Sequence, residues 1–328
     1  MTDNISDTDV SEILSRFDEE NDSYHRYAVD KALSHRQELT PHLIKILETL
    51  ADNPLIYSLE RHDGHIYAAA LLAHFGETSA HLPLIRAFSL SKELTDELWG
   101  DMITESLSVM LYRTSGGSTD AIKELAVNQT ADQFVRGAAV NALSLMVSFQ
   151  PSLRDEVVRF LQEALISEAP DDVNESYYLS NLAITICDLH PGESMEILRR
   201  AHEAGMIDWQ FLSLEEIEEA NAMTLEAALE RLHSRVSAMM PADIHDYMPW
   251  HTAPDWNKSA FPVGNSKKKE KRKTRRVKHK YTTGKKPGKK RRRIALTVGN
   301  ALGWRVVRQL TCWRNRWNIR AAVSALHA

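Results

Sequence analysis

Apolar side chains recur at helical spacing through most of the first 240 residues. Positions 43, 44, 46, 47 and 50 hold leucine or isoleucine, and positions 102, 103, 107, 110 and 111 hold methionine, isoleucine or leucine. Intervals of three and four residues place such side chains on one face of a helix. The one short candidate for a strand, residues 55–57, is discounted. The pattern therefore predicts an all-α fold.

Proline, glycine and capping residues punctuate these helices. Thr40 and Pro41 suit the cap and the first position of a helix, because a proline there gives up an N–H group that has no helical partner. Asn53-Pro54 is expected to end this helix, and Gly76 to end the next one. A further helix start is predicted at Pro151, with a marginal helix at residues 10–17 and a short amphipathic helix at residues 27–33.

The longer helices fall into pairs with a regular period. The predicted pairs are residues 66–75 with 81–90, 101–113 with 120–127, 131–149 with 151–165, and 177–189 with 193–204. A cluster of small residues at 68–70 recurs at 138–140, an offset of 70 residues. A period of about 35 to 38 residues is typical of two-helix repeats that stack into a solenoid. An irregular helical bundle with coincidental spacing is the alternative.

Several short motifs resemble a known bacterial family, domain-of-unknown-function family 1186. They occur in the family's order: ALSHRQELTP at 32–41, HIYA at 65–68, LLAHFGE at 71–77, GDMITE at 100–105 and VRGAA at 135–139. The resemblance covers residues 25–250. It implies a HEAT-like α-helical fold in a bacterial protein, and it brings no catalytic residues with it.

Charge is strongly segregated along the chain. Residues 1–265 hold 18 Lys+Arg and 44 Asp+Glu, a net charge of −26. Residues 266–328 hold 22 Lys+Arg and one acid, Glu270, a net charge of +21. The formal net charge of −5 is the sum of these opposed parts. Such asymmetry indicates an electrostatic tail.

The tail is expected to bind polyanions. Residues 267–293 carry 17 Lys+Arg in 27 positions with few apolar residues, a composition typical of disorder. Such a segment binds nucleic acid or anionic surfaces by releasing their counterions. Tyr281 alone could stack on a base, so sequence-specific recognition is not expected. A merely solubilising tail is the alternative. The candidate polyanion-binding residues are Lys267, Lys268, Lys269, Lys271, Arg272, Lys273, Arg275, Arg276, Lys278, Lys280, Lys285, Lys286, Lys289, Lys290, Arg291, Arg292 and Arg293.

Domain boundaries follow from these changes in composition. We predict a flexible acidic N-terminus at 1–22, a helical-repeat domain at 23–240, a linker at 241–265, a disordered polybasic segment at 266–293 and a Trp/Arg-rich terminal segment at 294–328. The prolines at 241, 249, 254 and 262 suit either an extended linker or a packed strap. The terminal segment suits an amphipathic helix on an anionic membrane or on nucleic acid. It is equally compatible with a terminus that has no function of its own.

Two groups of side chains offer candidate chemistry within the body. His62 and His65, with Asp63 or Glu77, form a conceivable metal site, although surface and core-edge histidines are the more ordinary interpretation. Paired carboxylates four residues apart, at positions 101 and 105, suit acid–base catalysis, but more often form a solvated face near a helix N-terminus.

Two further features lie later in the body. Cys187 sits in an apolar run and is expected to be a buried core thiol. Residues 215–219 begin an acidic helix that is predicted to run on toward Leu232. This helix suits either a basic partner, including the chain's own tail, or simple solvation.

Composition narrows the class of protein. Two cysteines rule out a disulfide framework and a four-cysteine zinc site. The acidic N-terminus lacks the apolar stretch of a signal peptide, and no run of 18 apolar residues suits a transmembrane helix. The sequence therefore predicts a cytoplasmic, non-enzymatic interaction protein that needs no cofactor, with a protein partner on its helical surface. A helical-repeat enzyme, such as a lyase or metal-dependent hydrolase, and a peripheral membrane adaptor are the alternatives.

Overall fold

The structure is a computed structural model that describes residues 7–19, 24–60, 62–168 and 176–247. The chain divides into two units, Met1–Pro262 and Val263–Ala328, and every described residue belongs to the first. These residues form sixteen α-helices and short 3-10 turns, and no strand occurs among them. The predicted all-α fold class is confirmed.

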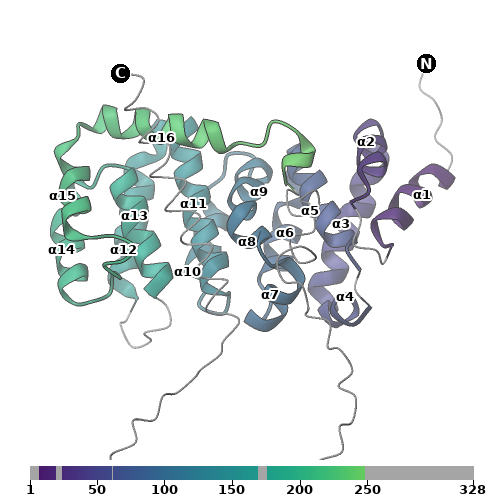
Figure 1. Cartoon of the computed structure of the whole chain (residues 1–328), viewed down its shortest axis with the longest axis horizontal. Coiled ribbons are helices and arrows are strands. Elements are labelled where there is room, and N and C mark those ends of the chain that lie inside the picture. The colour runs from purple at the N-terminus through teal and green to yellow at the C-terminus, as the bar shows by residue number, and fades with distance from the viewer. Residues whose placement is uncertain (1–6, 20–23, 61, 169–175, 248–328) are drawn as a thin grey trace, which may run out of the picture. The chain divides into compact units, whose positions relative to one another are not determined.

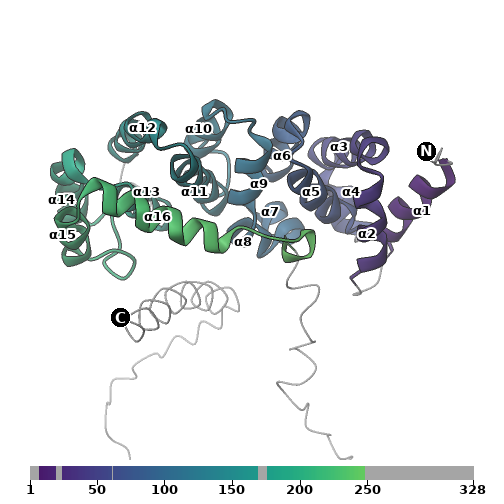
Figure 2. The same ribbon diagram turned by 90° about the horizontal axis from the view of Figure 1, so that it is seen from above.

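Eleven of these helices stack as two rows, seen in Figure 2. Row A contains α5 (Gly64–Phe75), α8 (Met102–Glu105) with α9 (Leu107–Thr114), α11 (Gln133–Phe149), α13 (Ser176–Asp188) and α15 (Leu214–Ala222). Row B contains α3 (Arg36–Asp52), α6 (His81–Phe88), α10 (Asp120–Val127), α12 (Arg154–Ser167) and α14 (Met195–Glu203). From α5 onward the chain alternates between the rows, so the four predicted helix pairs are present.

The remaining helices belong to neither row, and Figure 1 labels them. They are α1 (Asp7–Phe17), α2 (Arg26–Ser34), α4 (Pro54–Glu60), α7 (Lys92–Trp99) and α16 (Leu225–Met239). The 3-10 turns are Thr78–Ala80, Pro151–Leu153, Gly192–Ser194 and η5 (Ile244–Tyr247). Residues 55–57 lie in α4, so the prediction that they do not form a strand is confirmed.

A nearly constant sequence offset marks the side-chain contacts between successive layers. Bonds that span 32 to 35 residues are His65 Nε2 with the Leu98 carbonyl, His81 Nδ1 with Thr114 Oγ1, Gln162 Nε2 with Ser194 Oγ, Arg154 Nε with the Leu189 carbonyl, and His190 Nε2 with the Met223 carbonyl. Equivalent positions in neighbouring repeats meet at one period in a stacked array. The contacts therefore support the period inferred from the sequence.

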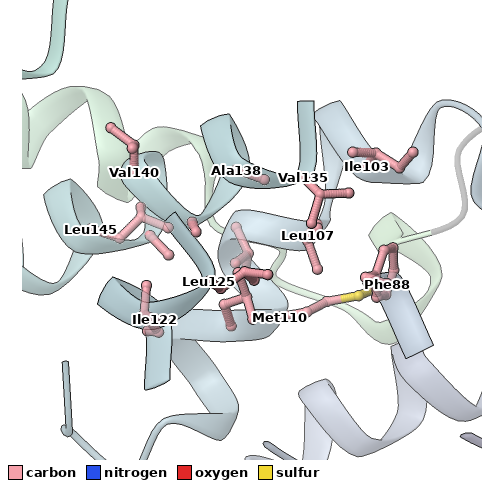
Figure 3. Close-up of a cluster of buried hydrophobic side chains, with 14 of the residues drawn as sticks. Phe88, Ile103, Leu107, Met110, Ile122, Leu125, Val135, Ala138, Val140 and Leu145 are labelled. Atoms are coloured by element: carbon pink, nitrogen blue, oxygen red, sulfur yellow. The ribbon is translucent and has the colours of Figure 1, made fainter. Parts of the chain in front are cut away.

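The core runs between the two rows, and Figure 3 shows part of it. Met110 of α9, Ile122 and Leu125 of α10, and Val135 of α11 converge there with Phe88 of α6, and each is at most 2% exposed. Full burial of one such side chain contributes about 2 kcal/mol. The alanine-rich starts of α5 and α11 are also buried, which lets neighbouring helices approach closely.

Three predicted helix boundaries are wrong. Helix α3 begins at Arg36 and contains Pro41, while the Thr40 hydroxyl donates to the Arg36 carbonyl instead of capping. Gln37 and Pro41 both lie on the exposed side, so water can take the place of the backbone bond that proline cannot make. The predicted helix 101–113 is divided at Ser106, whose φ of −127° departs from helical geometry.

The third wrong boundary concerns the acidic helix predicted from residue 215 toward Leu232. It ends at Ala222, because Met223 and Thr224 adopt extended backbone angles. The Thr224 side chain then accepts a hydrogen bond from the Ala227 N–H and so caps α16.

Other boundaries agree with the sequence. Gly76 ends α5 with φ +62°, the left-handed conformation that glycine adopts without strain. Asn53 follows the last residue of α3, and Pro151 opens the turn before α12. Within the N-terminus predicted to be flexible, residues 7–17 form α1, and Phe17 is fully buried against the body.

Candidate functional site

The most distinctive feature of the body is a return segment, residues 225–247, which we call the strap. After α15 the chain does not add another row B helix. Instead α16 runs back along the stack beside α13 and α11, as Figures 1 and 2 both show. The turn η5 then reaches α5 near the start of the stack. The strap thereby passes the C-terminal ends of row A helices.

Helix α16 is seated by an apolar stripe. Ala228, Leu232 and Val236 are buried and lie four residues apart, so they share one face of the helix. Two polar contacts fix its register. Arg235 forms a two-bond ion pair with Asp188, the last residue of α13, at 2.9 and 2.6 Å. His233 Nδ1 lies 3.0 Å from the carbonyl of Ser148, near the end of α11, and donates to it.

These contacts suit the ends of helices. The last carbonyl groups of a helix lack partners within it and carry the negative end of the helix dipole. A histidine N–H and an arginine in the strap supply donors and positive charge at the ends of α11 and α13. This arrangement explains why the strap follows the C-terminal edge of row A.

The far end of the strap is fixed by η5. Ile244, His245 and Tyr247 are buried, and His245 contacts residues more than 200 positions earlier. Its Nε2 lies 3.1 Å from the Asp30 carboxylate, and its Nδ1 bonds the Tyr24 hydroxyl. A carboxylate only accepts, so Nε2 carries the hydrogen and, in a neutral ring, Nδ1 accepts from Tyr24.

Arg113 of α9 supports the same end. Its Nη2 donates to the Pro241 carbonyl at 3.0 Å, and its guanidinium lies 5.7 Å from the centroid of the Tyr247 ring. The Ser106 hydroxyl, at the division between α8 and α9, lies 3.4 Å from the Tyr247 carbonyl. The strap therefore contacts α13, α11, α9, α8, α5 and α2.

The Tyr24–His245–Asp30 chain looks like a catalytic relay, but its electrostatics favour a structural role. Burial raises the pKa of Tyr24 well above its usual value. A hydroxyl that holds its proton this strongly is a poor nucleophile. Asp243 has a lowered pKa, chiefly because its carboxylate accepts a hydrogen bond from the His245 N–H. The arrangement is suited to joining two distant parts of the chain.

The seventeen predicted polyanion-binding residues, Lys267 to Arg293, lie outside the described residues. The predicted terminal segment, 294–328, also lies outside the described residues. Of the predicted linker, residues 241–247 are described, and they pack on the body as the end of the strap. The strap alternative, which the prolines suggested, thus applies to these seven residues.

The structure separates Glu77 from the two histidines that were suggested as metal ligands. His65 is fully buried, bonds the Leu98 carbonyl at 2.8 Å and contacts the Trp99 ring edge-on at 4.8 Å. Glu77 lies beyond the other end of α5, about 18 Å along the helix axis at 1.5 Å per residue. His62 is 3.9 Å from Asp18. No group of three potential metal ligands occurs in the described part of the chain.

The other candidates have structural surroundings. Asp101 precedes and Glu105 ends the four-residue α8, and both are exposed. Cys187, predicted to be a buried core thiol, is partly buried against the core, and this burial raises the pKa of its thiol. In the acidic helix, the Glu216 carboxylate and the Ser213 side chain form a reciprocal cap, and Glu218 pairs with Arg199.

Sequence reasoning missed the strap contacts. Tyr24 and Asp30 precede His245 by 221 and 215 positions, and no local pattern links them. The proline at 241 was the available signal, since it ends α16 and starts a new direction. None of the helices in the described ranges has both the length and the apolar composition of a membrane span.

Comparison with known proteins places the chain among proteins without an assigned activity. A protein of Chlamydia trachomatis serovar D, described as uncharacterized, is 31% identical over 211 residues, covering 64% of this chain and 83% of that protein. An uncharacterized protein of Chlamydia muridarum is also 31% identical over 211 residues, covering 64% and 84%. No solved structure matches the chain. The family model for proteins of unknown function DUF1186 matches residues 8–253, and the chain belongs to this family.

Proposed function

We propose that the protein is a non-enzymatic interaction protein with two binding parts. The stacked helices bind a protein partner, and the polybasic segment 267–293 binds nucleic acid or another polyanion without sequence specificity. The observation that carries this proposal is the segregation of charge, −26 in residues 1–265 against +21 in residues 266–328. Seventeen cationic side chains in 27 positions favour association with a phosphate backbone.

The architecture of the body supports the protein-binding part. Stacked helical repeats present extended surfaces that other proteins use for recognition. Several described titratable groups have structural partners, as in the Tyr24–His245–Asp30 chain and at the buried His65. These surroundings favour a scaffold over a catalytic site.

The acidic body is expected to weaken tail binding. Its negative charge competes with the polyanion for the basic tail, and this competition is screened over about 8 Å at physiological ionic strength. Because the binding of the tail is electrostatic, added salt is expected to displace the polyanion, whereas an uncharged competitor is not.

The test uses the full chain with all seventeen Lys and Arg residues of 267–293 replaced by glutamine. A matched variant replaces the five arginines at 305, 308, 314, 316 and 320 instead. Fluorescence anisotropy with a labelled single-stranded RNA and with a DNA duplex then gives the affinities. The proposal predicts loss of binding in the first variant and about equal retention for RNA and DNA in the second.

Two results would assign the binding differently. Unchanged affinity in the first variant would remove the polybasic segment from the mechanism. Loss in the second variant alone, together with flotation on anionic liposomes, would favour the peripheral membrane alternative.

A further inference from the structure

The strap connects layers that the stack itself does not connect. Many contacts within the stack join neighbouring layers at positions 32 to 35 residues apart, and the Asn181–Gly137 bond joins positions 44 residues apart. Contacts of the strap span 47 residues at Arg235–Asp188, 128 at Arg113–Pro241 and 221 at Tyr24–His245. A repeat array held only by neighbours is quasi-one-dimensional, so its layers can separate independently. The strap opposes this separation.

The two ends of the strap are held differently. At the near end, α16 buries an apolar stripe of three residues, and its ion pair is shielded, with Asp188 13% exposed. At the far end, the carboxylate of Asp30 that pairs with His245 is 54% exposed. Water reaches the Asp30 side of this contact, whereas His245 is only 8% exposed. The carboxylate of the far anchor is therefore less shielded from water than that of the near anchor.

Turn η5 is held in shape by its own residues. The Asp246 carboxylate accepts hydrogen bonds from the N–H groups of Ala242 and Asp243, both at 3.0 Å. The Asp243 carboxylate accepts from the His245 N–H at 3.2 Å. Since these bonds are internal, the turn can leave its seat without losing its fold.

The site on the body against which η5 packs also contains buried polar atoms that have no hydrogen-bond partner among the described residues. The Tyr247 hydroxyl and Nδ1 of His74 are buried without a hydrogen-bond partner among the described residues. Burying such groups costs free energy that the apolar contacts of Ile244 and Tyr247 must offset. This cost lowers the stability of the packed position of η5 relative to a position in which these groups reach water.

We propose that the strap is a two-point clamp whose far end opens while α16 stays seated. In the closed state, His245 and Tyr247 tie η5 to α2, α8 and α9, and the layers from α2 to α13 keep a fixed spacing. In the open state, η5 leaves this site as a preformed turn, pivoting about Met240–Pro241, and the first layers are released. The clamp thereby sets the spacing of the helices independently of any polyanion bound elsewhere.

Hydrogen exchange of the full chain, followed by mass spectrometry, tests the clamp. In the unmodified protein, amides of η5 are expected to exchange at least about tenfold faster than amides in the middle of α16, as expected for units of different local stability. Equal protection of η5 and α16 would overturn the proposal, since the strap would then open as one unit.

Two variants separate the anchors. Tyr24→Phe removes one bond to His245 and keeps the ring, so faster exchange is expected in η5 and α2 with α16 unchanged. Arg235→Gln weakens the near anchor, so both α16 and η5 should exchange faster. Arg200→Gln, in an exposed pair on α14, is the control and should change neither. A parallel response of α16 and η5 to Tyr24→Phe would contradict the two-point clamp.

Discussion

The side-chain amide of Asn181 donates a hydrogen bond to the carbonyl oxygen of Gly137 across 2.9 Å, and this bond joins α13 to α11. The two helices approach closely because Gly137 has no side chain. A Cβ atom at this position would lie 2.9 Å from Cε1 of Tyr177 and 3.3 Å from the Asn181 amide nitrogen. The glycine is therefore required by the packing of two neighbouring layers.

Replacing Gly137 with alanine should destabilise the body by about 1–3 kcal/mol, because the added methyl group overpacks the contact with the Tyr177 ring. Urea unfolding followed by circular dichroism measures the change. In a double-mutant cycle with Tyr177→Leu, the double variant should lose less unfolding free energy than the two single variants together, since the smaller side chain relieves the clash. Strict additivity would show that the close approach is not the cause.

Arg136 should be among the most sensitive positions in the body. It is completely buried, bonds the Ala126 carbonyl at 3.1 Å, pairs with Glu168 and lies 3.7 Å from the centroid of the Tyr178 ring. Arg136→Gln leaves a buried carboxylate without its charge partner, so we expect a loss of about 3–5 kcal/mol in the free energy of unfolding.

Arg200→Gln is the matched control for this loss. Arg200 and Glu196 form an ion pair in which both side chains are more than half exposed, and such a pair contributes under about 1 kcal/mol. Similar losses in the two variants would contradict the central position of Arg136 in the fold.

Acid should weaken the fold through His65. Burial lowers the pKa of His65 to about 4, from 6.5 in the unfolded chain. Because the unfolded state binds the proton first, stability is complete above pH 6.5 and falls as the pH drops toward 4, by up to about 3 kcal/mol. His65→Gln should flatten the pH dependence of the unfolding free energy in this window. An unchanged slope in the variant would assign the effect to other groups.

Cys187 should be inert in the folded protein. Burial raises the pKa of its thiol, and the thiolate is the reactive form. In a Cys312→Ser variant, which leaves Cys187 as the only cysteine, a thiol reagent at pH 8 should react only after unfolding in urea. Reaction of the folded variant at the unfolded rate would disprove burial of this thiol.

Local sequence signals predicted which segments form helices better than they predicted where each helix begins and ends. The apolar stripe ending at Leu50, the left-handed Gly76 and the period near 35 residues all depend on neighbours in the chain, and the structure agrees with them. The start of α3 was misplaced because the preference of proline for the first turn is statistical. Burial of Leu39 extends the helix past Pro41 toward its N-terminus.

The strap could not be predicted in the same way. Its contacts depend on where the far end of α16 arrives after the whole stack has formed, and Tyr24 and His245 carry no shared local pattern. For the residues near Pro241, the sequence suggested only two alternatives, a linker or a strap. Among the candidate metal ligands, Glu77 was misjudged for the opposite reason, because α5 carries it away from His65 although the two residues are close in sequence.

The most direct test of the proposed function is the salt dependence of polyanion binding by the full chain. The affinity for a labelled single-stranded RNA is measured between 50 and 200 mM salt. With about six or more phosphates contacted by segment 267–293, the affinity for a single strand should fall by a factor of about three hundred or more across this range. An affinity that is independent of salt, or no binding at the lowest salt, would contradict the proposal that the segregated positive charge is the binding arm.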